Sequence, residues 1–520
     1  AGYAQQGKCH EALNCFESMQ HEGLTPNEIT FICILKACGK VGAIEEGKKI
    51  HEHILRRSLL EKDIALGNAL VDMYVKCGVL IKAQEVLEEL HARNVISWST
   101  VIVGYAQQGR CKEAMECFER MQREGVSPDV VTFICILKAC GATRDIDKGK
   151  QIHYEIVNKG LLETDTVLGT ALVDMYAKCG ALAKAQEVLE KLRVRNVISW
   201  SALITGYAQR AQVDEALNCL DRMQSEGIAP NTVTFICILK ACGNTGSIEK
   251  GKQIHETFLR RGFLGEIVLG NALVDMYAKW GMLAKAQDVL EELPVRDIVS
   301  WNALITGYSK WGQGQETMNC FERVQNEGLS PDVVTFICVL KACGSTGAID
   351  KGKQIHEIIV SMGLLEKDIV LGTALVDMYA KCGALVKAKE VLEELPIRNV
   401  VSWSALIAGY SQERQACEAL DCLEQMQNEG FEPNAITILS ILSACSHAGL
   451  LHEAQLLFRY MTTKYGITAN LEHHTCMVVV FGCVGHFDEA ISVIKAMPAD
   501  YRAVWLALLG ACRNWGNVKL

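Results

Sequence analysis

Residues 95–109, VISWSTVIVGYAQQG, decide the fold, because near copies of this stretch recur throughout the chain. Its Ser-Trp pair recurs at intervals of 102, 101 and 102 residues, which places tryptophan at Trp98, Trp200, Trp301 and Trp403. Two further residue types repeat at the same interval, namely His51, His153, His255 and His356, and Met73, Met175, Met276 and Met378. The sequence is therefore an internal repeat that runs almost from end to end.

Each period of the repeat divides into three related units, which have 35, 36 and 31 residues in the period 95–196. We call them the Trp unit (95–129, containing GYAQQG), the Phe unit (130–165, opening with VVTF) and the Met unit (166–196, containing DMYAKCG). The other Trp units are 197–231, 298–332 and 400–434; the other Phe units are 28–63, 232–266 and 333–368; the other Met units are 64–94, 267–297 and 369–399. About fifteen units fit the chain, from a truncated one over 1–27 to a last full one over 471–502.

Each unit has the pattern of two amphipathic helices. In the Trp unit 95–129, Trp98, Ile102 and Tyr105 share one face of a first helix, and the same spacing follows in a second. Gly109 separates the two helices, and Gly125 ends the second. A lone hairpin of this size cannot bury both apolar faces, whereas stacked hairpins can. We therefore expect an all-α fold, an α-solenoid superhelix of stacked helix-turn-helix repeats; the periodicity does not give its hand.

The composition excludes several classes of protein. Apolar residues make up 49% and charged residues 22%, which argues against disorder, and no apolar run is long enough to span a membrane. The net charge of −9 argues against a simple polycationic nucleic-acid binder. There are 23 cysteines but no Cys-x-x-Cys, so we interpret the thiols as reduced packing residues.

The units resemble pentatricopeptide repeats of the plant class in which P, L and S motifs alternate. The Trp units resemble the P motif at Val95–Gly109, Val197–Gln209, Ile298–Gly312 and Val400–Glu413. The Phe units resemble the L motif at Val233–His255 and Val334–His356, and the Met units resemble the S motif at Val268–Gly281, with Trp280 in place of the usual cysteine. Leu471–Met497 resembles the family's terminal S-type motif, and Ala503–Leu520 resembles the start of its E1-type extension motif. The resemblance divides the chain into a repeat array over 1–434, terminal L-type and S-type motifs over 435–502, and the beginning of the extension over 503–520.

The resemblance implies sequence-specific binding of single-stranded RNA, one nucleotide per motif, and a role as a site-recognition factor for cytidine-to-uridine editing in a mitochondrion or chloroplast. It implies no cofactor, no membrane and no DNA, with a deaminase domain or editing co-factors acting downstream or in trans. Ala1-Gly2-Tyr3 carries no targeting signal, and the chain begins within a unit, so we expect a targeting segment outside this sequence. Two alternatives stay open: an organellar splicing, stability or translation factor without a deaminase, and a protein-binding helical scaffold.

The resemblance also implies which side chains read bases, namely the fifth and the last residue of a motif. The pairs are Asn68 with Asn94, Ser99 with Asp129, Thr170 with Asn196, Ser201 with Asn231, Asn271 with Asp297, Asn302 with Asp332, Thr373 with Asn399, and Ser404 with Asn434. Their family pairing predicts the RNA Y-G-n-A-A-n-U-U-n-A-A, in which the apolar fifth residues of the Phe units leave the bases marked n open. The units at 435–470 and 471–502 also remain unassigned. Helix capping by Asn and Asp is the structural alternative for the last slot.

Two further sets of residues recur in register. The second residue of a motif is expected to flank the base, and it is a branched apolar residue at Ile96, Val167, Ile198, Val268, Val299, Val370 and Val401. These residues fit an inter-repeat core equally well. Lysine recurs near the end of the first helix of the Met units, at Lys76, Lys178, Lys279 and Lys381, where we expect it to approach RNA phosphates. The alternative for these lysines is a solvated helix face or a partner for the helix dipole.

Catalytic chemistry is not indicated. A zinc deaminase needs a His-x-Glu and a Pro-Cys-x-x-Cys, and the sequence offers only His153-Tyr154-Glu155, inside a repeat. The recurring histidines lie a full period apart, so we interpret them as helix-packing residues rather than metal ligands. We therefore predict that this chain is not itself an enzyme.

Overall fold

The computed structural model describes residues 2–6, 8–61, 63–162, 165–261, 265–495, 504–506 and 508–510. All regular secondary structure in these residues is helical. The chain divides into two compact units, residues 1–254 and residues 255–520. Arg502 and most of 503–520, including the start of the expected extension motif, lie outside the described residues.

Every repeat unit contains a first and a second helix. Residues 1–254 contain α1 (Gly2–Gln5), α2 (Cys9–His21), α3 (Glu28–Val41), α4 (Ile44–Arg56), α5 (Ile64–Lys76), α6 (Leu80–Glu89), α7 (Val95–Gln107), α8 (Cys111–Arg123), α9 (Val130–Thr143), α10 (Ile146–Asn158), α11 (Thr166–Cys179), α12 (Leu182–Lys191), α13 (Val197–Gln209), α14 (Val213–Ser225) and α15 (Thr232–Thr245). A 3-10 turn, η1 (Leu59–Glu61), follows α4.

The division between the two compact units falls within α16 (Ile248–Arg261). Residues 255–520 then contain α17 (Ile267–Lys279), α18 (Leu283–Glu292), α19 (Ile298–Lys310), α20 (Gly314–Asn326), α21 (Val333–Thr346), α22 (Ile349–Ser361), α23 (Ile369–Lys381), α24 (Leu385–Glu394), α25 (Val400–Gln412), α26 (Ala416–Asn428), α27 (Ala435–Ala448), α28 (Leu451–Thr463), α29 (Leu471–Val484) and α30 (Phe487–Lys495). These helix pairs coincide with the repeat units that the sequence predicts.

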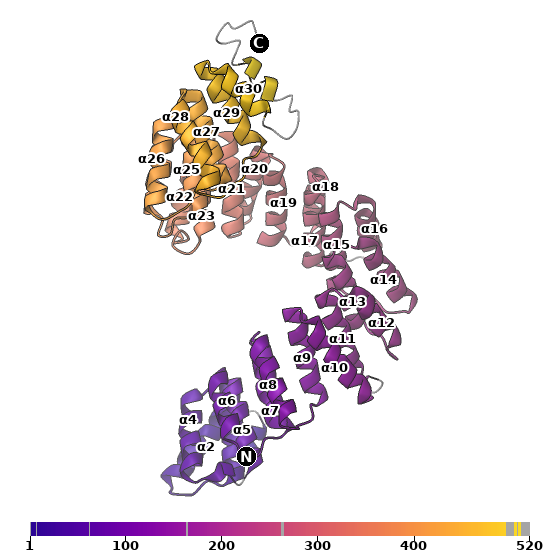
Figure 1. The fold of residues 1–520 in the computed structure, drawn as a ribbon. Helices are drawn as coiled ribbons and strands as arrows, with labels where there is room; N and C mark the ends of the chain where they lie inside the picture. Colours follow the sequence, from indigo (N-terminus) through magenta and orange to yellow (C-terminus); the bar gives the residue numbers. More distant parts are fainter. Residues whose placement is uncertain are drawn as a thin grey trace. The chain divides into compact units, whose positions relative to one another are not determined.

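Within each of the two compact units, the first helices of consecutive repeat units form one row and the second helices form another (Figure 1). In residues 1–254 the row runs from α3 through α5, α7, α9, α11 and α13 to α15, each helix packing against the next. A second helix packs against its own first helix and against the first helix of the following unit, as α8 does between α7 and α9. Residues 255–520 repeat this arrangement from α17 to α29. The prediction of an all-α solenoid is confirmed.

Glycine ends the helices where the sequence predicts. Gly109 follows α7 with φ of 72° and Gly125 follows α8 with φ of 75°, a left-handed conformation that costs glycine little. Each of these turns reverses the direction of the chain between two consecutive helices.

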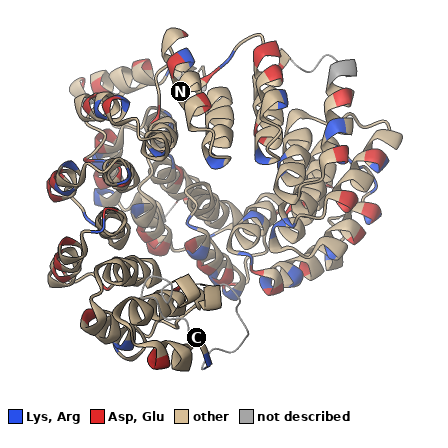
Figure 2. Cartoon of the chain, turned by 90° about the horizontal axis from the view of Figure 1, so that it is seen from above, with Lys and Arg blue, Asp and Glu red and all other residues tan. Residues whose placement is uncertain are grey.

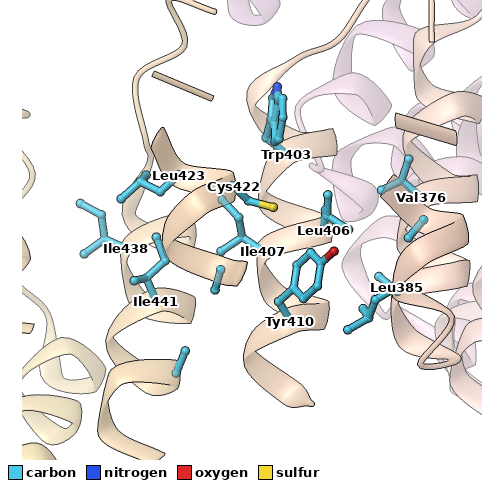
Figure 3. Close-up of a cluster of buried hydrophobic side chains, with 14 of the residues drawn as sticks. Val376, Leu385, Trp403, Leu406, Ile407, Tyr410, Cys422, Leu423, Ile438 and Ile441 are labelled. Atoms are coloured by element: carbon cyan, nitrogen blue, oxygen red, sulfur yellow. The ribbon is translucent and has the colours of Figure 1, made fainter. Parts of the chain in front are cut away.

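The core lies between the two rows and is built from the periodic apolar residues. Figure 3 shows it around α25, where Trp403, Leu406, Ile407 and Tyr410 are at most 7% exposed. Side chains from four neighbouring helices cover them, including Val376, Leu385, Cys422 and Ile438. Each hairpin therefore buries its apolar faces against its neighbours, as expected for a repeat array.

Most of the described cysteines are buried or half-buried in this core. Desolvation raises the pKa of the Cys38 and Cys140 thiols to about 12, so both stay protonated near neutral pH. The prediction that the thiols act mainly as packing residues agrees with this environment, although Cys15, Cys417 and Cys483 are exposed.

A polar contact joins the first helix of each Trp unit to the C-terminal end of its second helix. The Trp301 indole Nε1 donates to Glu327 Oε2 at 2.8 Å, and Arg296 lies 2.9 Å from the other oxygen of the same carboxylate. The equivalent contacts join Trp98, Glu124 and Arg93, Trp200, Glu226 and Arg195, and Trp403, Glu429 and Arg398. The indole N–H thereby keeps a partner although the ring is buried.

Candidate functional site

The last residue of each Trp and Met unit is the N-cap of the first helix that follows. Asp332, for example, has an extended backbone and accepts a hydrogen bond from the Thr335 backbone N–H at 3.0 Å. The same capping contact is made by Asn94, Asp129, Asn196, Asn231, Asp297, Asn399 and Asn434. The capping role is thus real, and it holds each of these side chains at a defined place between two first helices.

The fifth residue of a unit lies on the first turn of its first helix, and in five units it reaches the last residue. Asn302 Nδ2 donates to both carboxylate oxygens of Asp332 at 2.9 Å. The other direct contacts join Asn271 to Asp297 at 3.1 Å, Asn68 to Asn94 at 3.3 Å, Ser99 to Asp129 at 3.4 Å, and Ser201 to Asn231 at 3.5 Å. The structure therefore brings together residues that lie 26 or 30 positions apart in the sequence.

In the remaining three units the fifth hydroxyl turns to its own helix. Thr170 donates to the Thr166 carbonyl oxygen at 2.9 Å, Thr373 to that of Ile369 at 3.0 Å, and Ser404 to that of Val400 at 2.7 Å. Their predicted partners Asn196, Asn399 and Asn434 occupy the same N-cap position as in the other units. These pairs are therefore arranged in the same register without a direct bond between them.

A third residue, which the sequence pattern did not single out, joins the pair wherever a Trp unit precedes a Phe unit or the similar unit 435–470; we call all of these Phe-type units. The Thr335 hydroxyl donates to Asn302 Oδ1 at 2.6 Å, and three equivalent hydroxyl contacts join Thr132 to Ser99 at 2.6 Å, Thr234 to Ser201 at 2.7 Å, and Thr437 to Ser404 at 2.6 Å. The signal was present in the sequence, since each of these units has Thr as its third residue where the Trp units have Ser.

The second residue of each unit is exposed at the same end of the first helices. The seven residues expected to flank a base, Ile96, Val167, Ile198, Val268, Val299, Val370 and Val401, are 56–62% exposed. They are therefore not part of the inter-repeat core, and the core interpretation of these residues is wrong. The second residues of the Phe-type units, Ile29, Val131, Val233, Val334 and Ile436, are exposed as well. Exposed branched side chains therefore recur from repeat to repeat in both halves of the chain, residues 1–254 and residues 255–520.

The four recurring lysines end the first helices of the Met units or lie next to their ends, as predicted. Each also pairs with an aspartate one turn earlier, as Lys381 does with Asp377 at 2.7 Å. The other pairs are Lys76 with Asp72, Lys178 with Asp174, and Lys279 with Asp275. An anion that approaches these lysines therefore has to compete with a carboxylate that the helix already supplies.

Comparison with known proteins identifies the family. A PPR repeat family model matches residues 1–40, 93–142, 195–244, 296–345 and 398–447, and a PPR repeat model matches 68–95, 170–197, 271–298, 373–400 and 436–465. A pentatricopeptide repeat-containing protein of Arabidopsis thaliana, At5g27110, is 34% identical over 98% of this chain and 74% of its own length. The chain belongs to the pentatricopeptide repeat family.

Two other Arabidopsis thaliana relatives of this pentatricopeptide repeat chain carry organelle names. The chloroplastic protein At1g11290 is 34% identical over the full chain and 64% of its own length, and the mitochondrial protein At2g03380 is 33% identical over 94% of the chain and 70% of its own length. The chain therefore spans about two thirds to three quarters of these three relatives.

A solved pentatricopeptide repeat structure has the same fold. The crystal structure of the maize protein PPR10 in complex with an 18-nt psaJ RNA element superposes with a TM-score of 0.58, at 17% sequence identity, over 99% of this chain and 83% of that one. The match shows that the pentatricopeptide repeat chain has the same helical-repeat fold.

Charge is distributed unevenly between the two rows of helices of this pentatricopeptide repeat protein. The first helices α7, α13 and α25 contain no Asp, Glu, Lys or Arg, whereas second helices such as α8, CKEAMECFERMQR, are rich in both signs. Figure 2 shows some helices almost free of charge and others densely marked in red and blue. The net charge of −9 therefore does not describe the charge carried by these first helices.

The recurring histidines pack between helices in the described part of the pentatricopeptide repeat chain. His153 Nδ1 lies 2.9 Å from the Tyr176 hydroxyl, and burial lowers the pKa of His153. No group of His, Cys, Asp and Glu in the described residues could hold a metal ion. Within the same residues, no helix is long and apolar enough to cross a bilayer.

Proposed function

We propose that the chain binds single-stranded RNA in a sequence-specific way, with one nucleotide at each repeat unit. The observation that carries this proposal is the convergence of the fifth and last side chains at successive unit junctions, as in Asn302 and Asp332. Repeat arrays of this kind read one base with two or three side chains per repeat. The related structure of PPR10 is described as a complex with an 18-nt RNA element, which supports the same ligand class here.

The chemistry of each pair supports a base preference. The Asp332 carboxylate accepts hydrogen bonds only, so it matches the N3–H of uracil or the N1–H of guanine on the Watson–Crick edge. An Asn in the same slot, such as Asn231, can donate its amide N–H to N1 of adenine or N3 of cytosine. The exposed second residues, such as Val299 and Val334 on either side of the Asn302 junction, offer apolar contact to the faces of an unstacked base.

Binding to a defined oligonucleotide tests this proposal. We expect the purified chain to bind Y-G-n-A-A-n-U-U-n-A-A more tightly than a scrambled RNA of the same composition. Equal affinities for the two RNAs in filter binding would refute sequence-specific reading.

A single change at the last slot sharpens the test. Asp332→Asn keeps an N-cap of similar quality, because Asn and Asp cap helices about equally well. It replaces an obligate acceptor by a group that can donate, so the preference at that nucleotide is expected to move from uridine toward cytidine. The measurement is the ratio of dissociation constants for RNAs that differ only at that nucleotide, with Asp297→Asn as the matched change at the neighbouring uridine.

The alternation of three unit types leads us to assign the chain to the P, L and S class, and its role to site recognition in organellar cytidine-to-uridine editing. We place the array at 1–434, the terminal motifs at 435–502 and the beginning of an extension at 503–520, with a deaminase acting downstream or in trans. The organelle-named relatives support a mitochondrion or a chloroplast as the location. Sequencing organellar transcripts from plants that lack the protein tests this role. Loss of editing at a site that matches the predicted RNA is the expected result, whereas full editing with altered splicing or RNA abundance would contradict it.

A further inference from the structure

Hydrogen-bond partners differ between the two kinds of junction that carry the proposed reader pairs. The Asn271–Asp297 pair lies where a Met unit meets a Trp unit, and the Asn302–Asp332 pair lies where the next Trp unit meets a Phe unit. Both pairs consist of Asn and Asp, and both lie in residues 255–520. Any difference between them therefore comes from the residues around them.

The Thr335 side chain completes the second pair. Its hydroxyl donates to Asn302 Oδ1 at 2.6 Å and lies 3.0 Å from Asp332 Oδ1. Because Thr335 holds the side-chain oxygen of Asn302, the side-chain nitrogen Nδ2 faces Asp332. It donates to both carboxylate oxygens of Asp332. Thr335 is fully buried, so water does not compete for its hydroxyl.

The corresponding residue of the first pair makes no such contact. The Ser300 hydroxyl donates to the Asp297 backbone oxygen at 2.7 Å, within the helix cap. Asn271 Oδ1 is buried and accepts no hydrogen bond from any described residue. The Asn271 amide is therefore oriented only by its own donation to Asp297 Oδ1 at 3.1 Å, and the unsatisfied oxygen makes this orientation less favourable than that of Asn302.

The equivalent threonine of another Phe unit, Thr132, sets the hydrogen-bonding direction of the serine Ser99 in residues 1–254. The Thr132 hydroxyl donates its one proton to Asp129 Oδ1 at 2.6 Å, so the Ser99 hydroxyl has to donate its own proton, to Thr132 at 2.6 Å or to Asp129 Oδ1 at 3.4 Å. The Ser99 proton is then committed, and Ser99 can offer a base only acceptor lone pairs. Thr234 arranges Ser201 in the same way.

We infer that Thr132, Thr234 and Thr335 are positioning residues that fix the hydrogen-bonding direction of the fifth side chain in the preceding Trp unit. The consequence is that nucleotides facing Trp units are discriminated more sharply than nucleotides facing Met units. This inference rests on the proposed RNA-reading function and goes beyond it, because it ranks the reading positions and assigns the ranking to a residue outside the reader pair.

The two Asn–Asp pairs allow a matched test in the full chain. The probes are the predicted RNA and two variants, each with cytidine in place of one of the two adjacent uridines. Thr335→Val removes the hydroxyl but keeps the branched shape, and Ser300→Ala removes the equivalent capping hydroxyl at the other junction. Both variants lose one buried side-chain contact at a helix cap, so their thermal unfolding serves as the common measure of structural damage.

We expect the parent protein to prefer uridine more strongly at the Asn302 position than at the Asn271 position. Thr335→Val is expected to lower the uridine-to-cytidine ratio at its own nucleotide by about fivefold, the effect of losing one buried hydrogen bond. Ser300→Ala should leave the ratio at the Asn271 position unchanged, and Thr335→Ser, which restores a hydroxyl, should recover the parent ratio.

The outcomes separate this inference from the function on which it rests. If the parent discriminates the predicted RNA but Thr335→Val weakens all RNAs equally, Thr335 acts only as a helix cap and the inference is overturned. If the parent binds the predicted and scrambled RNAs alike, the reading function itself fails and the inference fails with it.

Discussion

The Nδ1 atom of His51 lies 3.0 Å from the hydroxyl oxygen of Tyr74, where α4 packs beside α5. Desolvation lowers the pKa of His51 to about 4 and raises the pKa of Tyr74 to about 12. The same pair recurs at the other Phe–Met junctions as His153 with Tyr176, His255 with Tyr277, and His356 with Tyr379, each with a lowered histidine pKa. Each junction thus holds a buried or half-buried imidazole whose neutral form is favoured.

The pH dependence of stability follows from these histidines. An unfolded histidine titrates near pH 6.5, whereas folded His51 titrates near pH 4, so the folded state resists protonation. The stability due to His51 is fully present above pH 6.5 and is lost as the pH falls toward 4, by about 2 kcal/mol at pH 5. Urea unfolding at pH 7 and pH 5 measures this loss. His51→Gln, which does not titrate, should show a smaller loss, and an unchanged loss would contradict the assignment.

The close approach of consecutive units at Gly307 gives a second prediction. A Cβ atom at this position would lie 2.7 Å from the Ala278 Cβ and 3.1 Å from a Leu283 methyl carbon. Gly307→Ala is therefore expected to destabilise the array by about 1–3 kcal/mol, although alanine is the better helix former. Thermal unfolding measures the loss. The double variant Gly307→Ala with Ala278→Gly should recover part of it, and strictly additive losses would show that the two positions do not interact.

The exposed second residues give a third prediction, which concerns binding rather than stability. Val401 is 59% exposed on the first helix α25, and Val386 is 74% exposed on the second helix α24. Val401→Asp is expected to weaken RNA binding by about tenfold, as for loss of one base-face contact, and to leave the unfolding transition in place. Val386→Asp is the control and should leave RNA affinity unchanged. Equal effects of the two changes would argue against a base-flanking role.

The paired lysines give a fourth prediction, which salt dependence tests. If the Lys381 ammonium contacts a phosphate, Lys381→Gln should reduce the slope of log affinity against log salt by about 0.7, the value for one contact to a single strand. Asp377→Asn removes the competing carboxylate, so it should raise RNA affinity at low salt. A slope that both changes leave untouched would place Lys381 away from the RNA.

Periodicity alone was enough to predict the helical hairpins, because residues such as Trp98, Ile102 and Tyr105 must share a face in a helix of this length. The glycine turns and the stacking of units followed from the same pattern. The reader slots came from a family resemblance, and the structure adds that each last residue caps the next first helix.

Contacts across the repeat were harder to predict. Thr335 lies 33 residues from Asn302, and no local rule links residues at that separation. The pairing of Lys381 with Asp377 follows from their i, i+4 spacing, and this local competitor has to be weighed against phosphate contact. The surface position of Val401 was ambiguous, because a branched apolar residue fits a core and a binding face equally well.

The last residue of a Trp or Met unit caps a helix and also belongs to the proposed reader pair. These two roles limit which substitutions can change the RNA target of such a protein. Asn and Asp cap a helix about equally well, whereas most apolar residues at the N-cap cost about 1 kcal/mol. Exchange between Asn and Asp at positions such as Asp297 and Asp332 therefore changes the group presented to a base with little change in folding free energy. New target preferences can be reached one residue at a time through stable intermediates, which makes the array a practical scaffold for directed redesign.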